Sequence, residues 1–139
     1  MKWLPVPKLQ AFDETGRPLL YLTFDDGPEP LVTPRILKIL AQFDAKASFF
    51  CLGRNVSRHY DLFKEIINNG HLACNHSYSH LKGWTTCKSV YIKDIDRAGM
   101  YFSNHYFRPP YGKISPSQYW HLKKKYALVF WNEIGRAHV

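Results

Sequence analysis

The stretch Leu19-Leu20-Tyr21-Leu22-Thr23-Phe24-Asp25-Asp26-Gly27-Pro28 decides the fold, because an apolar run ends there on two carboxylates and a Gly-Pro turn. A continuous apolar run of this length is typical of a buried strand, and Gly27-Pro28 forces the chain to turn. Consecutive side chains at a strand end point in different directions. Of Asp25 and Asp26, one can therefore bind a cation while the other stays free as a base. An Asp-Gly-Pro turn, in which carboxylates accept hydrogen bonds from backbone N–H groups, is the structural alternative.

Strands and helices are expected to alternate along the rest of the chain. Further strands are expected at 45–52, 71–74, 106–107 and 127–131, and helices at 57–69, 89–103, 116–125 and from Thr33, which would act as the N-cap before Pro34. Such alternation indicates parallel βαβ units. In these folds the carboxyl ends of the strands carry the chemistry, so motifs that follow separate strands meet at one rim. The sequence therefore predicts an α/β fold with parallel strands.

Size and composition limit the classes of function. The chain has 139 residues, 45% of them hydrophobic and 16% aromatic, which fits one folded domain and argues against disorder. No apolar run reaches the roughly 18 residues of a membrane span, and the prolines and lysine in residues 1–8 argue against a signal peptide. The net charge of +8 is scattered, apart from Lys123-Lys124-Lys125 at an expected helix end, so no nucleic-acid partner is expected.

The second chemical motif is His76-Ser77-Tyr78-Ser79-His80. Two histidines four residues apart face one side of a helical turn, which is a common metal-binding spacing. No glutamate follows His76, so the pair is not the His-Glu-x-x-His of metalloproteases. Neutral imidazoles suit zinc, and one aspartate would complete a three-ligand site with the open position that a catalytic metal needs. Two surface histidines without a metal are the alternative.

The sequence gives no further metal ligands among the cysteines and the remaining histidines. An odd count of three cysteines without a Cys-x-x-Cys pair argues against a disulfide framework and a zinc ribbon. Cys51 lies in an apolar run and is expected in the core. Cys74 lies two residues before His76, but the other candidates already make a ligand set, so we do not expect it to bind the metal. The histidines expected on the surface or in the core are His59, His71, His105, His121 and His138.

The third motif is Arg108-Pro109-Pro110-Tyr111-Gly112. Its two prolines make the segment rigid, and the guanidinium of Arg108 can bind a carboxylate with two N–H groups. A plain proline turn with a solvated arginine is the alternative. Together, in this order, the three motifs are difficult to explain by packing alone.

As a set, the three motifs resemble those of the polysaccharide deacetylase family, also called the NodB-homology domain or carbohydrate esterase family four. The likeness runs from about Leu20 to Trp131, and Lys46-Ala47-Ser48-Phe49-Phe50 supports it. The stretch from Asn75 to Trp84 is most similar to bacterial members. The resemblance implies a deformed (β/α) barrel with a metal at its rim.

The resemblance also implies a role for each motif residue. Asp25 would be the general base, Arg108 would orient the carboxylates, and the backbone N–H of Tyr111 would help to hold an oxyanion. The reaction implied is the removal of acetyl groups from an N-acetylated polysaccharide such as peptidoglycan or a chitin-like glycan. An O-acetyl xylan esterase and a non-catalytic carbohydrate-binding pseudo-enzyme remain alternatives. The implied ligands of the metal, most often Zn²⁺, are Asp26, His76 and His80.

The family pattern stops after Trp131. The Asp-Trp motif and the Leu-x-x-His motif, which supplies the general acid in the family, are not found in the chain. We therefore interpret 1–18 as an N-terminal extension, 19–132 as a partial deacetylase domain with an incomplete barrel, and 133–139 as a non-native tail translated from a sequencing adapter. We expect such a chain to be weakly active or inactive. The family suggests a cell-envelope substrate, while the glycan, the compartment and the oligomeric state stay open.

Overall fold

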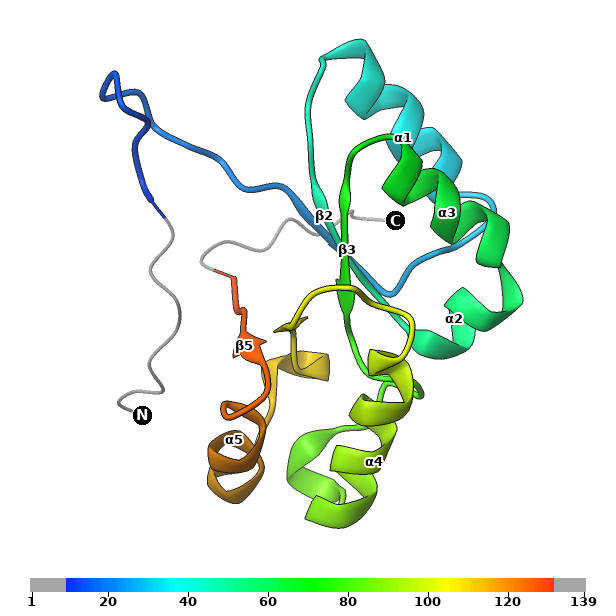
Figure 1. Ribbon diagram of the computed structural model, residues 1–139, viewed down its shortest axis with the longest axis vertical. Coiled ribbons are helices and arrows are strands. Elements are labelled where there is room, and N and C mark those ends of the chain that lie inside the picture. Colours follow the sequence, from blue (N-terminus) through cyan, green and yellow to red (C-terminus); the bar gives the residue numbers. More distant parts are fainter. Residues whose placement is uncertain (1–9, 132–139) are drawn as a thin grey trace.

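A computed structural model describes residues 10–131 of the chain; the expected tail at 133–139 and His138 lie outside this range. Five parallel strands form one sheet in the order β1-β2-β3-β4-β5, and the paired strands β2 and β3 lie near the centre of Figure 1. The prediction of an α/β fold with parallel strands is confirmed. The strands are β1 (Thr23–Asp25), β2 (Ser48–Cys51), β3 (Leu72–Asn75), β4 (Tyr106–Phe107) and β5 (Ala127–Leu128). The helices are α1 (Thr33–Gln42), α2 (Gly53–Arg58), α3 (Tyr60–Asn68), α4 (Lys88–Gly99) and α5 (Pro116–Leu122), with 3₁₀ turns at Gly83–Thr85 and Pro110–Gly112.

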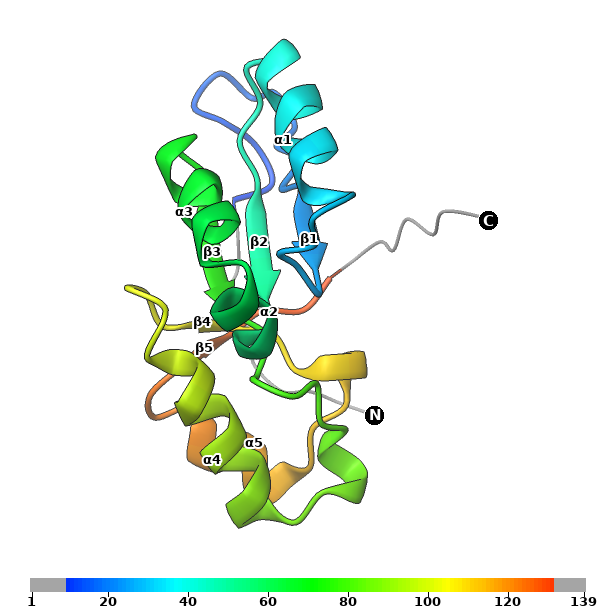
Figure 2. The same ribbon diagram turned by 90° about the vertical axis from the view of Figure 1, so that its right-hand side faces the viewer.

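The sheet is strongly curved. β1, β2 and β3 lie side by side next to α1 and α3, whereas β4 and β5 cross below them at a steep angle (Figure 2). β1 and β5 are the two opposite edges of the sheet in the pairing order, yet the side chain of Arg108 reaches residues at both edges. Its Nη1 donates to Thr23 Oγ1 at 2.8 Å, and its Nε donates to the carbonyl of Val129, directly after β5, at 3.3 Å. In the described part of the chain no strand pairing joins β1 to β5, so the curved sheet is a partial barrel, open along this side.

Two apolar clusters hold the helices on the sheet. The first lies between α1, α3 and the strands β2 and β3, and it includes Leu40, Phe49 and Ile66. The second lies between α4, α5 and the strands β4 and β5, and it includes Ile95 and Phe107. Both clusters support the strands whose carboxyl ends carry the three motifs. None of the helices within residues 10–131 is long and apolar enough to cross a bilayer.

The first strand is shorter than predicted. The pairing of β1 with β2 begins at Thr23, opposite Ser48, and residues 19–22 lie before it. Leu20 is 83% exposed, so the expectation of a buried strand over 19–24 was wrong for its first half. β1 is one of the two edge strands in the described sheet, and an apolar run does not by itself reveal which of its residues have a neighbouring strand.

The helix boundaries differ from the predictions where side chains make local contacts. The expected N-cap Thr33 makes no capping bond to α1; its hydroxyl accepts from Glu29 N at 2.9 Å instead. The helix expected over 57–69 spans the last two residues of α2 and the whole of α3, because the backbone leaves the helical region at His59 (φ −131°, ψ 51°). The helix expected over 116–125 ends at Leu122 and begins with a capping box, in which the side chains of Ser115 and Gln118 each accept from the other's backbone N–H.

The packing of α3 gives a direct test of the first apolar cluster. Ile66 is completely buried, whereas its neighbour Ile67 is 47% exposed. Ile66→Ala is expected to lower the free energy of unfolding by about 2–5 kcal/mol, because the lost methyl groups leave a cavity. Ile67→Ala is the matched control and should cost less than about 1 kcal/mol. Denaturant unfolding of both variants measures the difference, and equal losses would contradict this packing.

Candidate metal centre

The two carboxylates at the end of β1 point to different partners. Asp26 has a left-handed backbone (φ 71°), a conformation that aspartate tolerates better than most residues. Its N–H donates to Phe50 O at 3.1 Å, and its carbonyl accepts from Asn55 Nδ2 at 2.7 Å, so the turn is held on both sides. The carboxylate of Asp25 faces Arg108, while the carboxylate of Asp26 faces the two histidines.

His76 and His80 lie on a loop after β3, so the expectation of a helical turn was wrong. Ser77 (φ 71°) and His80 (φ 61°) both have left-handed backbones, which break a helical repeat. Side chains take over the hydrogen bonds that a helix would supply. Asn75 Oδ1 accepts from Ser77 N at 2.8 Å, and Ser77 Oγ accepts from His80 N at 3.0 Å. The loop therefore turns both imidazoles toward the end of β1.

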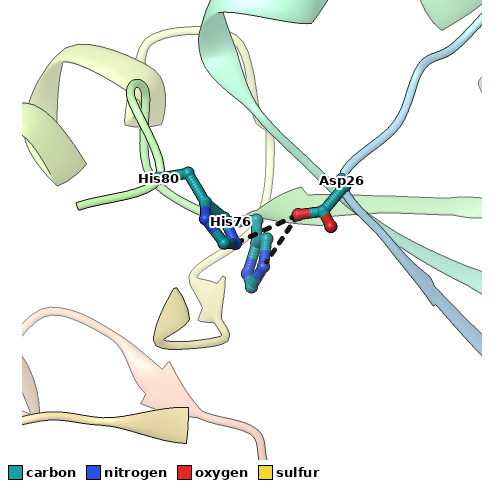
Figure 3. A group of neighbouring side chains, drawn as sticks. All are labelled: Asp26, His76 and His80. Atoms are coloured by element: carbon teal, nitrogen blue, oxygen red, sulfur yellow. Dashed lines mark ion pairs between the residues drawn. The ribbon is translucent and has the colours of Figure 1, made fainter. Parts of the chain in front are cut away.

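The side chains of Asp26, His76 and His80 converge on one point (Figure 3). Asp26 Oδ1 lies 3.4 Å from His76 Nε2 and 3.2 Å from His80 Nε2. The three potential ligand atoms lie within 4.8 Å of one another. With Zn–N and Zn–O bonds of about 2.0–2.1 Å, ligand atoms on a tetrahedral ion lie about 3.3 Å apart. The spacing of the carboxylate to each imidazole therefore fits a shared divalent cation.

The tautomer of His76 supports the same conclusion. Its Nδ1 lies 2.7 Å from the carbonyl oxygen of Arg108, and because a carbonyl only accepts, Nδ1 must carry the hydrogen. With the hydrogen on Nδ1, Nε2 is the ring nitrogen that faces Asp26, and in the neutral form of the ring it offers a lone pair to a cation there. A lone pair that faces a carboxylate needs a proton or a cation between them, and a backbone carbonyl on the other ring nitrogen is the usual support of a metal-binding histidine.

The charges around the site also suit a cation. Hydrogen bonds with His76 and His80 hold the pKa of Asp26 far below its usual range against the opposing effect of burial, so this carboxylate is ionised at neutral pH. Cys74 is not part of the three-residue group. Burial raises the pKa of its thiol to about 12, although the charge of Arg108 acts in the opposite direction. Cys74 is completely buried, as a core residue would be.

Arg108 connects the metal-binding loop to Asp25. Its Nη1 donates to Asp25 Oδ1 at 2.7 Å, and its guanidinium carbon lies 4.0 Å from the centre of the Phe50 ring. The side chain is almost fully buried, and further donors reach the carbonyls of Val129 and Phe130. Because its own carbonyl accepts from His76, one residue fixes the direction of both the free carboxylate and a candidate ligand.

Tyr111 completes the rim. Its ring centre lies 4.6 Å from that of His80, and its backbone is left-handed (φ 59°). Its backbone N–H has no hydrogen-bond acceptor within residues 10–131. The structure thus brings all six predicted site residues to one rim, although sequence reasoning did not single out Asp94, which accepts two N–H groups of the histidine loop. An acidic residue in a helix far from the motifs carries no local signal of such a contact.

Comparisons with known proteins identify the family. The family model described as "Polysaccharide deacetylase" matches residues 12–130. A peptidoglycan-N-acetylglucosamine deacetylase of Bacillus cereus is 37% identical over 120 residues, covering 80% of this chain and 43% of the relative. A chitooligosaccharide deacetylase of Rhizobium leguminosarum bv. trifolii is 44% identical over 84 residues, covering 59% and 39%. The chain therefore spans less than half the length of these curated relatives.

A solved structure extends the likeness to three dimensions. The crystal structure of a peptidoglycan N-acetylglucosamine deacetylase superposes with a TM-score of 0.73 at 35% sequence identity, covering 78% of this chain and 54% of the other. This likeness agrees with the partial barrel seen in the curvature of the sheet.

Removal of one imidazole tests the candidate centre. We expect the chain to bind Zn²⁺ near neutral pH, and His80→Ala to weaken binding by roughly 100-fold or more, since residues that only support ligands already contribute about 10–100-fold. Competition with a coloured chelator measures the affinity. His121→Ala, which removes an exposed histidine elsewhere, is the control and should leave the affinity unchanged. Equal affinity in His80→Ala and the parent chain would exclude this centre.

Proposed function

The chain belongs to the polysaccharide deacetylase family, and from this premise we propose that it carries the metal centre of a hydrolase that removes acetyl groups from an N-acetylated polysaccharide. The observation that supports the proposal most strongly is the convergence of Asp26, His76 and His80, with carboxylate-to-imidazole distances of 3.4 and 3.2 Å. We infer that these three residues hold a divalent metal, most often Zn²⁺ in sites of this composition. A divalent cation bound there supplies Lewis-acid chemistry, which polarises oxygen and makes water reactive near neutral pH.

Asp25 is proposed as the general base. It lies next to a metal ligand in sequence, but its carboxylate points away from the two imidazoles to Arg108. The hydrogen bond of 2.7 Å from Arg108 Nη1 directs Oδ1 of Asp25 toward the guanidinium, while the side chain stays 30% exposed. A carboxylate that is oriented and still open to solvent can accept a proton from attacking water. Arg108 is a positioning residue in this proposal.

Tyr111 is proposed as the donor to the developing oxyanion. Water adds its oxygen to the acetyl carbonyl carbon, its proton passes to Asp25, and negative charge gathers on the carbonyl oxygen. The ring of Tyr111 lies against that of His80, and its backbone N–H has no acceptor among residues 10–131, so we propose that it donates to such an oxygen. Backbone donors that are held in place before the reaction are an effective way to stabilise this charge.

Cleavage of the C–N bond then needs an acid. Acetate and a free amine leave, and the amine must gain a proton as it departs. The Leu-x-x-His motif that the family resemblance implies for this step is not found in the 139-residue sequence. We therefore propose that this chain on its own is weakly active or inactive, and that its centre works fully only together with such an acid.

The proposed substrate class is a cell-envelope glycan that contains N-acetylglucosamine. The names of the two relatives, one acting on peptidoglycan and one on chitooligosaccharides, support this class. An O-acetylated xylan is the alternative substrate for the same chemistry, because the residues of the metal centre do not determine which sugar is bound. A non-catalytic carbohydrate-binding role is the alternative outside catalysis.

Substitution of Asp25 distinguishes a catalytic role of the site from a role in binding alone. In any form of the protein that releases acetate, Asp25→Asn is expected to lower the rate by about 10²–10⁴-fold, because the base is lost while the ligands remain. The affinity for Zn²⁺ should stay close to that of the parent. Asp61→Asn, which removes an exposed carboxylate of α3, is the matched control and should keep its activity. An unchanged rate in Asp25→Asn would exclude this residue as the base.

Acetate release identifies the substrate and tests the activity of the chain. The assay uses peptidoglycan, chitin oligosaccharides and acetylated xylan, with the Zn²⁺-loaded 139-residue chain and any longer product of the same reading frame. We expect acetate from the N-acetylated glycans with a longer product, and little or none with the 139-residue chain. Normal turnover by the 139-residue chain would contradict the proposed need for a further acid. Binding of a glycan without acetate release by any form would favour the non-catalytic alternative.

A further inference from the structure

Helix α4 holds the loop that carries the two histidines. The Oδ2 atom of Asp94 accepts hydrogen bonds from Tyr78 N and Ser79 N, each at 3.0 Å. Tyr78 and Ser79 are the two residues between Ser77 and His80, and this loop is not helical. One carboxylate therefore fixes the centre of the loop, and charge-assisted bonds of this kind are stronger than bonds between neutral groups.

Helix α2 holds the same loop from the other side. Gly53 N donates to Ser77 O at 2.9 Å, and Arg54 N donates to Tyr78 O at 3.2 Å. The approach is so close that a Cβ atom on Gly53 would lie 2.5 Å from Tyr78 Cδ2 and 3.1 Å from the Cα atom of Ala98 in α4. The loop is thus fixed between two helices, and α2 leaves it no room to move toward that side.

The two histidines depend on this arrangement to different degrees. His76 continues directly from β3, where its N–H donates to Cys51 O at 3.0 Å and its ring is held by the carbonyl of Arg108. His80 lies at the far end of the loop, and its N–H donates to the hydroxyl of Ser77, at 3.0 Å. Its left-handed backbone (φ 61°) is a conformation that persists only when the surroundings impose it.

We propose that Asp94 is a positioning residue of the metal centre, which orders the loop so that the imidazole of His80 faces Asp26 and His76. The inference rests on the proposed function, since it takes the three residues as metal ligands. Without the Asp94 carboxylate, Tyr78 N and Ser79 N lose their acceptor and the loop can relax away from its left-handed turns. The chain is then expected to bind the metal more weakly and with a changed coordination geometry.

Helix α4 offers a matched control. Asp96 is also a half-buried carboxylate with two hydrogen bonds, but they go to Lys125 Nζ at 2.8 Å and to Tyr126 Oη at 3.1 Å, away from the histidine loop. Asp94→Ala and Asp96→Ala therefore remove the same group from the same helix. Only the first removes a contact to the loop.

The test measures Zn²⁺ affinity by chelator competition and the visible absorption spectrum of the Co²⁺-loaded chain. Asp94→Ala is expected to weaken Zn²⁺ binding by about 10–100-fold, the usual effect of a supporting residue, and to alter the Co²⁺ spectrum. Asp94→Asn keeps an acceptor oxygen and should recover part of the affinity. Asp96→Ala should bind Zn²⁺ as the parent does, even where thermal unfolding of both metal-free alanine variants shows a similar loss of stability.

The outcomes separate the two proposals. If the parent chain binds no Zn²⁺, the proposed function fails and the role of Asp94 fails with it. If the parent binds Zn²⁺ and Asp94→Ala has the same affinity and the same Co²⁺ spectrum, only the role of Asp94 is overturned.

Amide hydrogen exchange of the parent chain tests the role of Asp94 without any substitution. The amides of Tyr78 and Ser79 are expected to be protected from exchange. Exchange as fast as in an unstructured peptide would overturn the role of Asp94.

Discussion

The rest of the structure depends on the hydrogen bonds that the buried guanidinium of Arg108 makes. It joins Thr23 and Asp25 of β1 to the carbonyls of Val129 and Phe130 after β5, so it connects the two edges of a sheet that have no strand pairing with each other in the described residues. A buried arginine is stable only when its donors have partners, and these four groups accept from four of its five N–H donors. The same side chain therefore connects the two edges of the curved sheet and directs the Asp25 carboxylate.

The same residue links the fold to the candidate metal centre through its backbone. Its carbonyl holds Nδ1 of His76, which leaves Nε2 to face Asp26. The centre is thus formed by strand ends on one side and, on the other, by the histidine loop that is hydrogen-bonded to α2 and α4. β1 and β3 place Asp26 and His76 directly, whereas His80 depends on the contacts of α2 and α4 with its loop. This difference explains why a residue outside the three motifs can matter for the metal.

Much of this arrangement could be predicted from the sequence, because alternating strands and helices bring separate strand ends to one rim. The path of the loop that carries His76 and His80 could not be predicted in this way. The left-handed backbones of Ser77 and His80 depend on contacts with residues outside the motif, including Asp94, and a spacing of four residues looks helical without them. The exposed position of Leu20 was missed for a related reason, since an apolar run does not show whether a strand has a neighbour.

The central claim is that Asp26, His76 and His80 share one divalent ion. A crystal structure of the Zn²⁺-loaded chain, with anomalous data collected at the zinc edge, tests it most directly. The account predicts one strong anomalous peak about 2.0–2.2 Å from an oxygen of Asp26 and from Nε2 of both histidines. A peak bound elsewhere, or no peak between these side chains in Zn²⁺-saturated crystals, would contradict it.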